Sequence, residues 1–211
     1  MTLFQLILLI ASFIFAYKFF EQVFSNSKDG SNLNDEEIIK RQQVSHLQML
    51  QNRFNDLLER ADDAMNDDNF ESAKKSLYEA IKIRPKNEEV LLKLASVLLF
   101  TREYEESASF YKKALNIDEH NDYAHRGIAS VYAHLEKFDE AIEHYKKALT
   151  INSNDAITYY NYANLLQKLE KLKEAKHHYA IALNINPDFK EAKAEFEKLE
   201  EKLSSDEEPK T

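Results

Sequence analysis

Residues 122–155 read DYAHRGIASVYAHLEKFDEAIEHYKKALTINSND. Apolar residues recur at three- and four-residue steps from Tyr123 to Leu135 and again from Phe138 to Leu149. This spacing is typical of two amphipathic helices joined by a short link. Neither helix can bury its apolar face alone, so each needs the other and a neighbouring copy.

The same pattern occurs four times at a spacing of 34 residues, without insertion or deletion. Three registers hold small residues and a fourth holds large ones. They are Ala61, Ala95, Ala129 and Ala163; Ala73, Ser107, Ala141 and Ala175; Ala80, Ala114, Ala148 and Ala182; and Leu77, Tyr111, Tyr145 and Tyr179. Small residues allow helix backbones to approach, and large ones fill the space beside them. A fixed period of this length predicts one helix pair stacked on copies of itself.

The pattern resembles the tetratricopeptide repeat, whose marks include small–aromatic–small spacing in the second helix and a closing proline. Two of the four units close on a proline, at Pro85 and Pro187, whereas the others have Glu119 and Ser153 there. The resemblance implies an all-α fold, a right-handed α-solenoid of four helix pairs with a C-terminal capping helix. It also implies a protein or peptide partner bound in the concave groove.

The predicted organisation follows from these repeats and from the composition at both ends. It comprises a transmembrane anchor (1–24), a linker (25–34), a leading helix (35–53), unit one (54–87), unit two (88–121), unit three (122–155), unit four (156–189), a capping helix (190–203) and a disordered acidic tail (204–211). The leading helix either runs straight into unit one or packs as a separate helix. Self-association through it is an alternative that the short apolar stripe leaves open.

The N-terminal segment is predicted to cross a membrane. Residues 3–17, LFQLILLIASFIFAY, carry no charge, and the apolar character continues to Phe20. About 18 helical residues span roughly the hydrocarbon core of a bilayer. Lys and Arg follow the segment and none precedes it, which places the repeats in the cytoplasm, most simply at a bacterial inner membrane. A cleaved signal peptide is the rival interpretation, although no basic residue precedes the apolar run.

The composition argues against several kinds of chemistry. The chain has no cysteine and a formal net charge of −9, which disfavours thiolate metal sites and nucleic-acid binding. No phosphate-binding loop, nucleophile motif or metal-binding spacing is present, so we expect no enzyme activity, cofactor or metal. His144 and His178 occupy equivalent positions and are expected to be solvated on the outer face.

The geometry implied by the resemblance turns the first helix of each unit towards the groove. The predicted partner-binding residues are Lys93, Phe100, Tyr123, Arg126, Ser130, Tyr160, Asn161 and Asn164. The full inward-facing set adds Leu58, Asp62, Met65, Leu92, Ser96, His134 and Lys168. Asparagine amides can bond a peptide backbone, aromatic rings can anchor it, and Lys93 and Arg126 can take a carboxylate.

Some relatives clamp a chaperone's C-terminal carboxylate with Lys, Asn and Arg. Of the five matching positions here only Lys93 is suitable, so that clamp is not expected. The sequence therefore predicts a membrane-tethered scaffold or assembly factor that binds a protein segment. The alternatives are a periplasmic or secreted assembly chaperone and a homo-oligomer built through the leading helix.

Overall fold

The computed structural model describes residues 17–18, 21 and 35–207, and these residues form helices and turns with no strand. The chain divides into two compact parts, residues 1–51 and 52–211. Among the described residues no helix is long and apolar enough to cross a bilayer. Most of the predicted anchor, all of the linker 25–34 and residues 208–211 lie outside the described residues.

One continuous helix, α2 (Asp35–Asn66), contains the leading segment and the first helix of unit one. The sequence allowed the leading helix either to run straight into unit one or to pack as a separate helix, and the structure has the first arrangement. Five large apolar side chains of its first part are between 43% and 64% exposed: Ile38, Ile39, Val44, Leu47 and Met49. From Phe54 onward the helix contributes buried residues to the core of the repeats.

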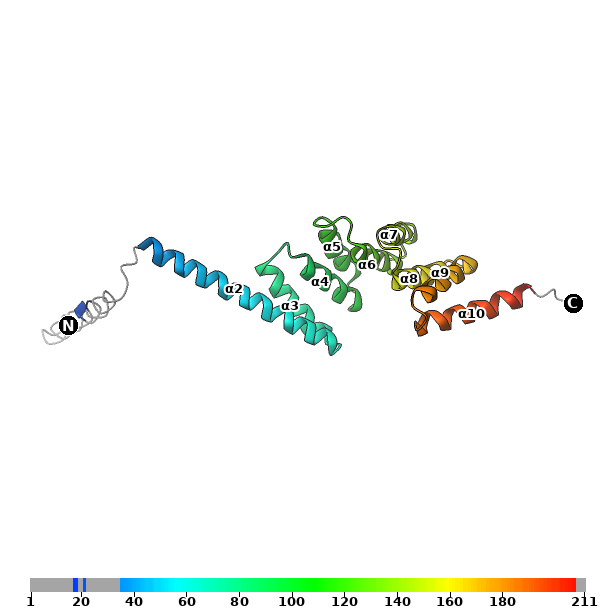
Figure 1. Cartoon of the computed structure of the whole chain (residues 1–211), viewed down its shortest axis with the longest axis horizontal. Coiled ribbons are helices and arrows are strands. Elements are labelled where there is room, and N and C mark those ends of the chain that lie inside the picture. The colour runs from blue at the N-terminus through cyan, green and yellow to red at the C-terminus, as the bar shows by residue number, and fades with distance from the viewer. Residues whose placement is uncertain (1–16, 19–20, 22–34, 208–211) are drawn as a thin grey trace, which may run out of the picture. The chain divides into compact units, whose positions relative to one another are not determined.

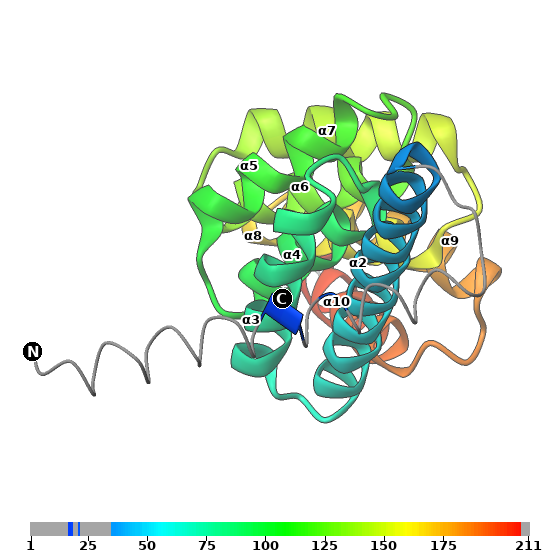
Figure 2. The same ribbon diagram turned by 90° about the vertical axis from the view of Figure 1, so that its left-hand side faces the viewer.

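The helices that follow keep the period of the sequence (Figure 1). They are α3 (Phe70–Ile83), α4 (Glu88–Phe100), α5 (Tyr104–Leu115), α6 (Asp122–His134), α7 (Phe138–Ile151), α8 (Ala156–Lys168), α9 (Leu172–Ile185) and α10 (Lys190–Glu207). The second helices begin at 70, 104, 138 and 172, and the first helices of the later units at 88, 122 and 156. Within a unit α4 packs on α5, α6 on α7 and α8 on α9, and each pair also contacts the next. In Figure 2, α5 and α7 lie above α4 and α6.

Local chemistry explains where these helices begin and end. Asn87, Asn121 and Asp155 precede α4, α6 and α8, and each side chain accepts a hydrogen bond from a backbone N–H of the first turn. These residues lie 34 apart, so the cap is part of the repeat. The link to the second helix passes through one residue in the left-handed region in every unit: Asp68 (φ 54°), Arg102 (φ 64°), Glu136 (φ 58°) and Glu170 (φ 60°).

The four registers found in the sequence form the core, as predicted. Every one of their residues is at most 2% exposed. Ser107, the one polar member of the small-residue registers, donates its hydroxyl to the Ala95 carbonyl oxygen over 2.6 Å, which satisfies it inside the core. The capping helix is longer than predicted, because residues 204–207 of the expected disordered tail continue α10. Ala192 and Leu199 of α10 are buried and seal the last apolar face.

Candidate peptide-binding groove

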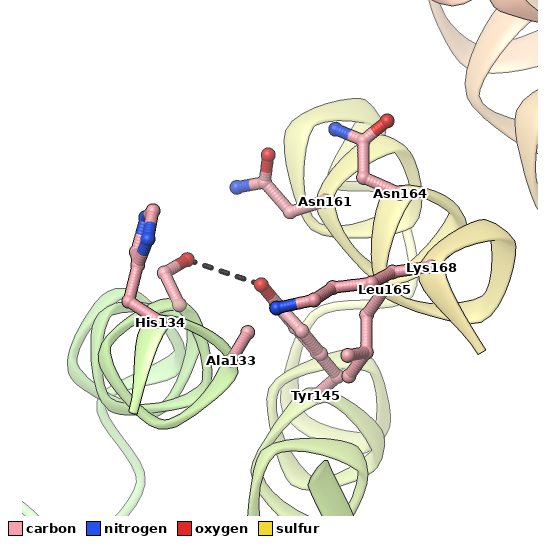
Figure 3. A pocket seen from close by; sticks show the side chains of 8 residues that line it. Ala133, His134, Tyr145, Asn161, Asn164, Leu165 and Lys168 are labelled. Atoms are coloured by element: carbon pink, nitrogen blue, oxygen red, sulfur yellow. Dashed lines mark hydrogen bonds between the residues drawn. The ribbon is translucent and has the colours of Figure 1, made fainter. Parts of the chain in front are cut away.

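An open pocket of about 290 Å³ lies where units three and four meet. Its walls come from α6, α7 and α8 (Figure 3). The lining residues are Ser130, Ala133, His134, Tyr145, Asn161, Asn164, Leu165 and Lys168. Figure 3 shows the Asn161 amide projecting from α8 towards the helix of His134, and the Asn164 amide projecting from α8 towards the top of the view.

In units three and four, a tyrosine hydroxyl from the second helix forms a hydrogen bond with a pocket residue of the first helix. The Tyr145 and Ser130 hydroxyl oxygens lie 3.1 Å apart, and the Tyr179 hydroxyl lies 2.5 Å from Asn164 Oδ1. The same pairing occurs in unit two, where Ser96 Oγ and the Tyr111 hydroxyl are 2.9 Å apart. Burial raises the pKa of Tyr145 to about 12, so its hydroxyl stays protonated at neutral pH.

One rim of the groove carries a row of side chains that changes along the array, and we call it the edge row. It consists of the last residues of α4, α6 and α8, namely Phe100, His134 and Lys168. Each one lies against the first residue of the second helix in the preceding unit. Phe100 stacks on Phe70 at 5.0 Å between ring centroids, His134 stacks on Tyr104 at 4.8 Å, and the Lys168 ammonium lies 5.0 Å from the Phe138 centroid.

The two cations predicted to take a partner's carboxylate already hold carboxylates of this chain. Lys93 Nζ lies 2.7 Å from Asp62 Oδ1 and 2.7 Å from Glu89 Oε1. Arg126 pairs with Asp155, and their side chains are only 17% and 14% exposed. Lys93 therefore joins unit two to unit one, and Arg126 joins α6 to the residue that caps α8.

Family profiles and known folds agree with this architecture. Tetratricopeptide repeat profiles match residues 64–131, 123–155 and 144–177, which together run over more than half of the chain. The chain belongs to the tetratricopeptide repeat family. It matches none of the curated proteins.

Several solved structures of repeat proteins are similar to this chain. PilF of Pseudomonas aeruginosa superimposes with a TM-score of 0.65 at 20% identity, over 74% of this chain and 71% of PilF. The crystal structure of MamA gives a TM-score of 0.59 at 20% identity, over 71% of this chain and 81% of MamA. The first repeat domain of Spaghetti (RPAP3), bound to the HSP90 peptide SRMEEVD, gives 0.52 at 27% identity, over 56% of this chain and 93% of that domain. The first two likenesses concern the fold alone.

Three of the eight predicted partner-binding residues meet in this tetratricopeptide repeat pocket: Ser130, Asn161 and Asn164. Phe100 lies at the other end of the edge row and is 65% exposed. The remaining four take part in contacts within the chain. For example, the Tyr123 hydroxyl lies 2.7 Å from Ser96 Oγ, and the Tyr160 ring lies 4.9 Å from the Phe189 ring at the start of the cap.

His134 and Lys168 line the pocket although they were not among those eight residues. The sequence placed both on the inward face, and their position at the helix ends was the signal that they share a rim. Burial of the His134 ring, together with the nearby charges of Lys168 and Arg102, lowers its pKa. The imidazole is therefore neutral at pH 7 and can both donate and accept a hydrogen bond.

His144 and His178 were expected to be solvated on the outer face, but both are half-buried. His125 is 8% exposed, and its Nδ1 lies 2.9 Å from the Nδ1 of His144. His125 Nε2 lies 3.1 Å from the Glu119 carbonyl oxygen, which can only accept, so Nε2 carries the proton and Nδ1 accepts from His144. Burial, followed by the nearby His125 and Lys147, lowers the pKa of His144 to about 4. His178 packs against the Tyr162 ring, with 4.6 Å between centroids.

Metal binding finds no support in the part of the chain that the structure describes, where no three His, Asp or Glu side chains are placed to hold an ion. The paired imidazoles of His125 and His144 provide two nitrogens only. The arrangement at the groove can instead form hydrogen bonds and apolar contacts with an extended chain, which is chemistry for binding.

Proposed function

We propose that this protein is a membrane-tethered interaction scaffold whose groove binds a segment of a protein partner. The observation that carries the proposal is the contrast between the buried registers, which repeat, and the pocket at units three and four, which does not. Side chains that vary over an invariant scaffold are available for recognition. A repeat domain of 27% identity has been solved with a bound peptide, which supports a peptide as the occupant.

The groove can be tested by crosslinking in cells of the native host. A photo-crosslinking amino acid placed at Asn161, which lines the pocket, should join the chain to a partner protein. A second label at Lys146, which is exposed on α7 and does not line the pocket, is the matched control. Equal adducts at both positions, or none at Asn161, would contradict the groove assignment.

The tether rests on the sequence of residues 3–20 and is part of the same proposal. Confining the repeats to a membrane raises their effective concentration for partners in that membrane. We expect the full chain to stay with the membrane fraction after a carbonate wash and the chain lacking residues 1–24 to be released. Alkaline phosphatase activity from a fusion after residue 211 would instead favour the periplasmic chaperone.

A second candidate function, self-association, is favoured by the exposed apolar side chains of α2. Val44 and Leu47 are 62% and 64% exposed, and a partner helix would remove that surface from water. Sedimentation of the full chain should then show a dimer that the Val44→Glu/Leu47→Glu variant lacks. A monomer for the unchanged chain would exclude this function and leave the groove proposal intact.

A further inference from the structure

The edge row changes in chemical character from one end of the groove to the other. Phe100 is apolar, His134 is a neutral imidazole and Lys168 is a cation, although all three occupy the same position in successive units. The backbone therefore presents three different side chains to a ligand in the same geometry. A segment lying along this rim meets a different partner at each step.

The Phe100 end of the row offers apolar surface. Phe100 remains 65% exposed even though its ring stacks on Phe70 with only 5° between the planes. Stacking holds the ring in one orientation, so little side-chain entropy is lost when a ligand covers it. An apolar or aromatic side chain is the group that this surface fits.

The Lys168 end offers hydrogen-bond donors. No carboxylate is among the eight residues that line the pocket. The Tyr179 hydroxyl lies 2.5 Å from Asn164 Oδ1 and 2.8 Å from Gln167 Oε1, so the Oδ1 side of the Asn164 amide faces the tyrosine and its Nδ2 is left as a donor. The Lys168 ammonium adds a charge that is 51% exposed. The Glu136 carboxylate lies 3.7 Å from Lys168 Nζ and is itself 73% exposed, so the pair is loose.

We propose that the groove selects a segment in which an apolar side chain and a carboxylate lie about six residues apart, the first at Phe100 and the second at Lys168. The inference deepens the proposed function and rests on it. Helices of successive units pack roughly 10 Å apart, so the two points are about 20 Å from each other. An extended chain advances about 3.3 Å per residue, which gives the six-residue spacing.

Fluorescence anisotropy with synthetic peptides and the purified full chain tests the inference. The probe is a labelled, acetylated and amidated peptide with phenylalanine and glutamate six residues apart in a serine–glycine background, in both sequence orders. We expect at least one order to bind about fivefold or more tightly than the same peptide with glutamine for glutamate, or with the two residues adjacent. A further peptide with glutamine and a free C-terminal carboxylate at that position separates a side-chain carboxylate from a chain terminus.

Variants then assign each preference to its residue. Lys168→Gln should abolish the preference for glutamate over glutamine, and Phe100→Ala should weaken both peptides equally. Glu136→Gln, which removes the competing carboxylate, should strengthen the glutamate peptide alone. An unchanged glutamate preference in Lys168→Gln, or equal binding of all peptides, would overturn the inference.

The outcome is separable from that of the proposed function. A partner crosslinked at Asn161 together with no peptide selectivity would refute the inference and leave the scaffold intact. Absence of both the crosslink and any peptide binding would refute the two together.

Discussion

Asp62 and Lys93 occupy, where units one and two meet, the positions that Ser130 and Asn161 occupy where units three and four meet. At the first junction the two side chains form an ion pair at 2.7 Å. At the second the same positions open into a pocket. The helices repeat with the same period, so the side chains decide whether a junction is closed by an ion pair or left open as a pocket.

The junction between units two and three has a third arrangement. A substitution there has the largest effect on stability that we predict. Gly127 stands at the position of Lys93 and Asn161, and a Cβ there would lie 2.2 Å from Tyr111 Cζ. Tyr111 is 2% exposed and bonded to Ser96, so its ring has nowhere to move. Gly127→Ala should lower the free energy of unfolding by about 3 kcal/mol.

Urea denaturation measures this change, and Asn161→Ala at the equivalent position is its control. Asn161 faces open space, and alanine favours helix, so this variant should be neutral or slightly more stable. Equal destabilisation of the two variants would show that Tyr111 does not fill the middle junction.

Exchanging the side chains should convert the open junction into the closed one. Ser130→Asp/Asn161→Lys recreates the pair of the first junction, and Asp can still accept from the Tyr145 hydroxyl. We expect crosslinking or peptide affinity at the groove to fall about tenfold or more, with stability changed by less than about 1 kcal/mol. Undiminished binding to the stable double variant would mean that the partner does not use this pocket.

The histidine pair of unit three should make stability depend on pH. The pKa of a histidine in the unfolded chain is about 6.5, whereas burial lowers the pKa of His144 in the folded chain to about 4. Between these two values the unfolded chain therefore binds more protons. Stability should therefore be constant above about pH 7 and decline as pH falls below 6.5. Because the His144 ring is partly exposed, we expect a loss on the order of 1 kcal/mol between pH 7 and 5.5.

Unit two supplies the control for this comparison, since Leu91 and Phe110 stand where unit three has His125 and His144. His125→Leu/His144→Phe should flatten most of the pH dependence, and the remainder would come from His134 and His178, whose pKa values burial also lowers. Denaturation midpoints at several pH values measure the difference. A slope that the double variant keeps in full would assign it to other groups.

The smallest effect concerns the turns, where the units are alike in backbone but not in residue. Arg102 has φ 64° without being a glycine, a conformation that costs an ordinary residue roughly 1–2 kcal/mol. Arg102→Gly should raise stability by about 0.5–1 kcal/mol after the added flexibility of the unfolded chain is counted. Arg102→Ala, which keeps the Cβ, should gain nothing in the same thermal melt.

The sequence was sufficient for the core because packing repeats with the period. Ala95, Ala129 and Tyr145 are buried where the registers placed them. The contacts in the groove were harder to predict from the sequence, because the contact that a side chain makes there depends on its neighbour in another helix pair. Lys93 finds Asp62 across 31 residues and Arg126 finds Asp155 across 29, and neither separation is a multiple of the period. No periodic pattern could have revealed that these cations were already paired.

The histidines were misplaced for a related reason. His125 stands where the family has a first-helix aromatic residue, so its ring is buried as an aromatic ring would be, and its centroid lies 5.1 Å from that of His144. Residue type suggested a solvated side chain, whereas position within the repeat decided the burial. In such an array, the register of a residue is the better guide to its environment.

The unbroken 34-residue interval between helix starts makes each unit an interchangeable part. An in-frame second copy of residues 88–121 would lengthen the array by one step of roughly 10 Å and leave each capping residue in place. Only the new joint would differ, because the copied Lys93 would face Ser96 in place of Asp62. The spacing between two recognition residues and the ligand group that each one prefers can thus vary independently. The number of units sets the spacing, and single substitutions set the preferred group.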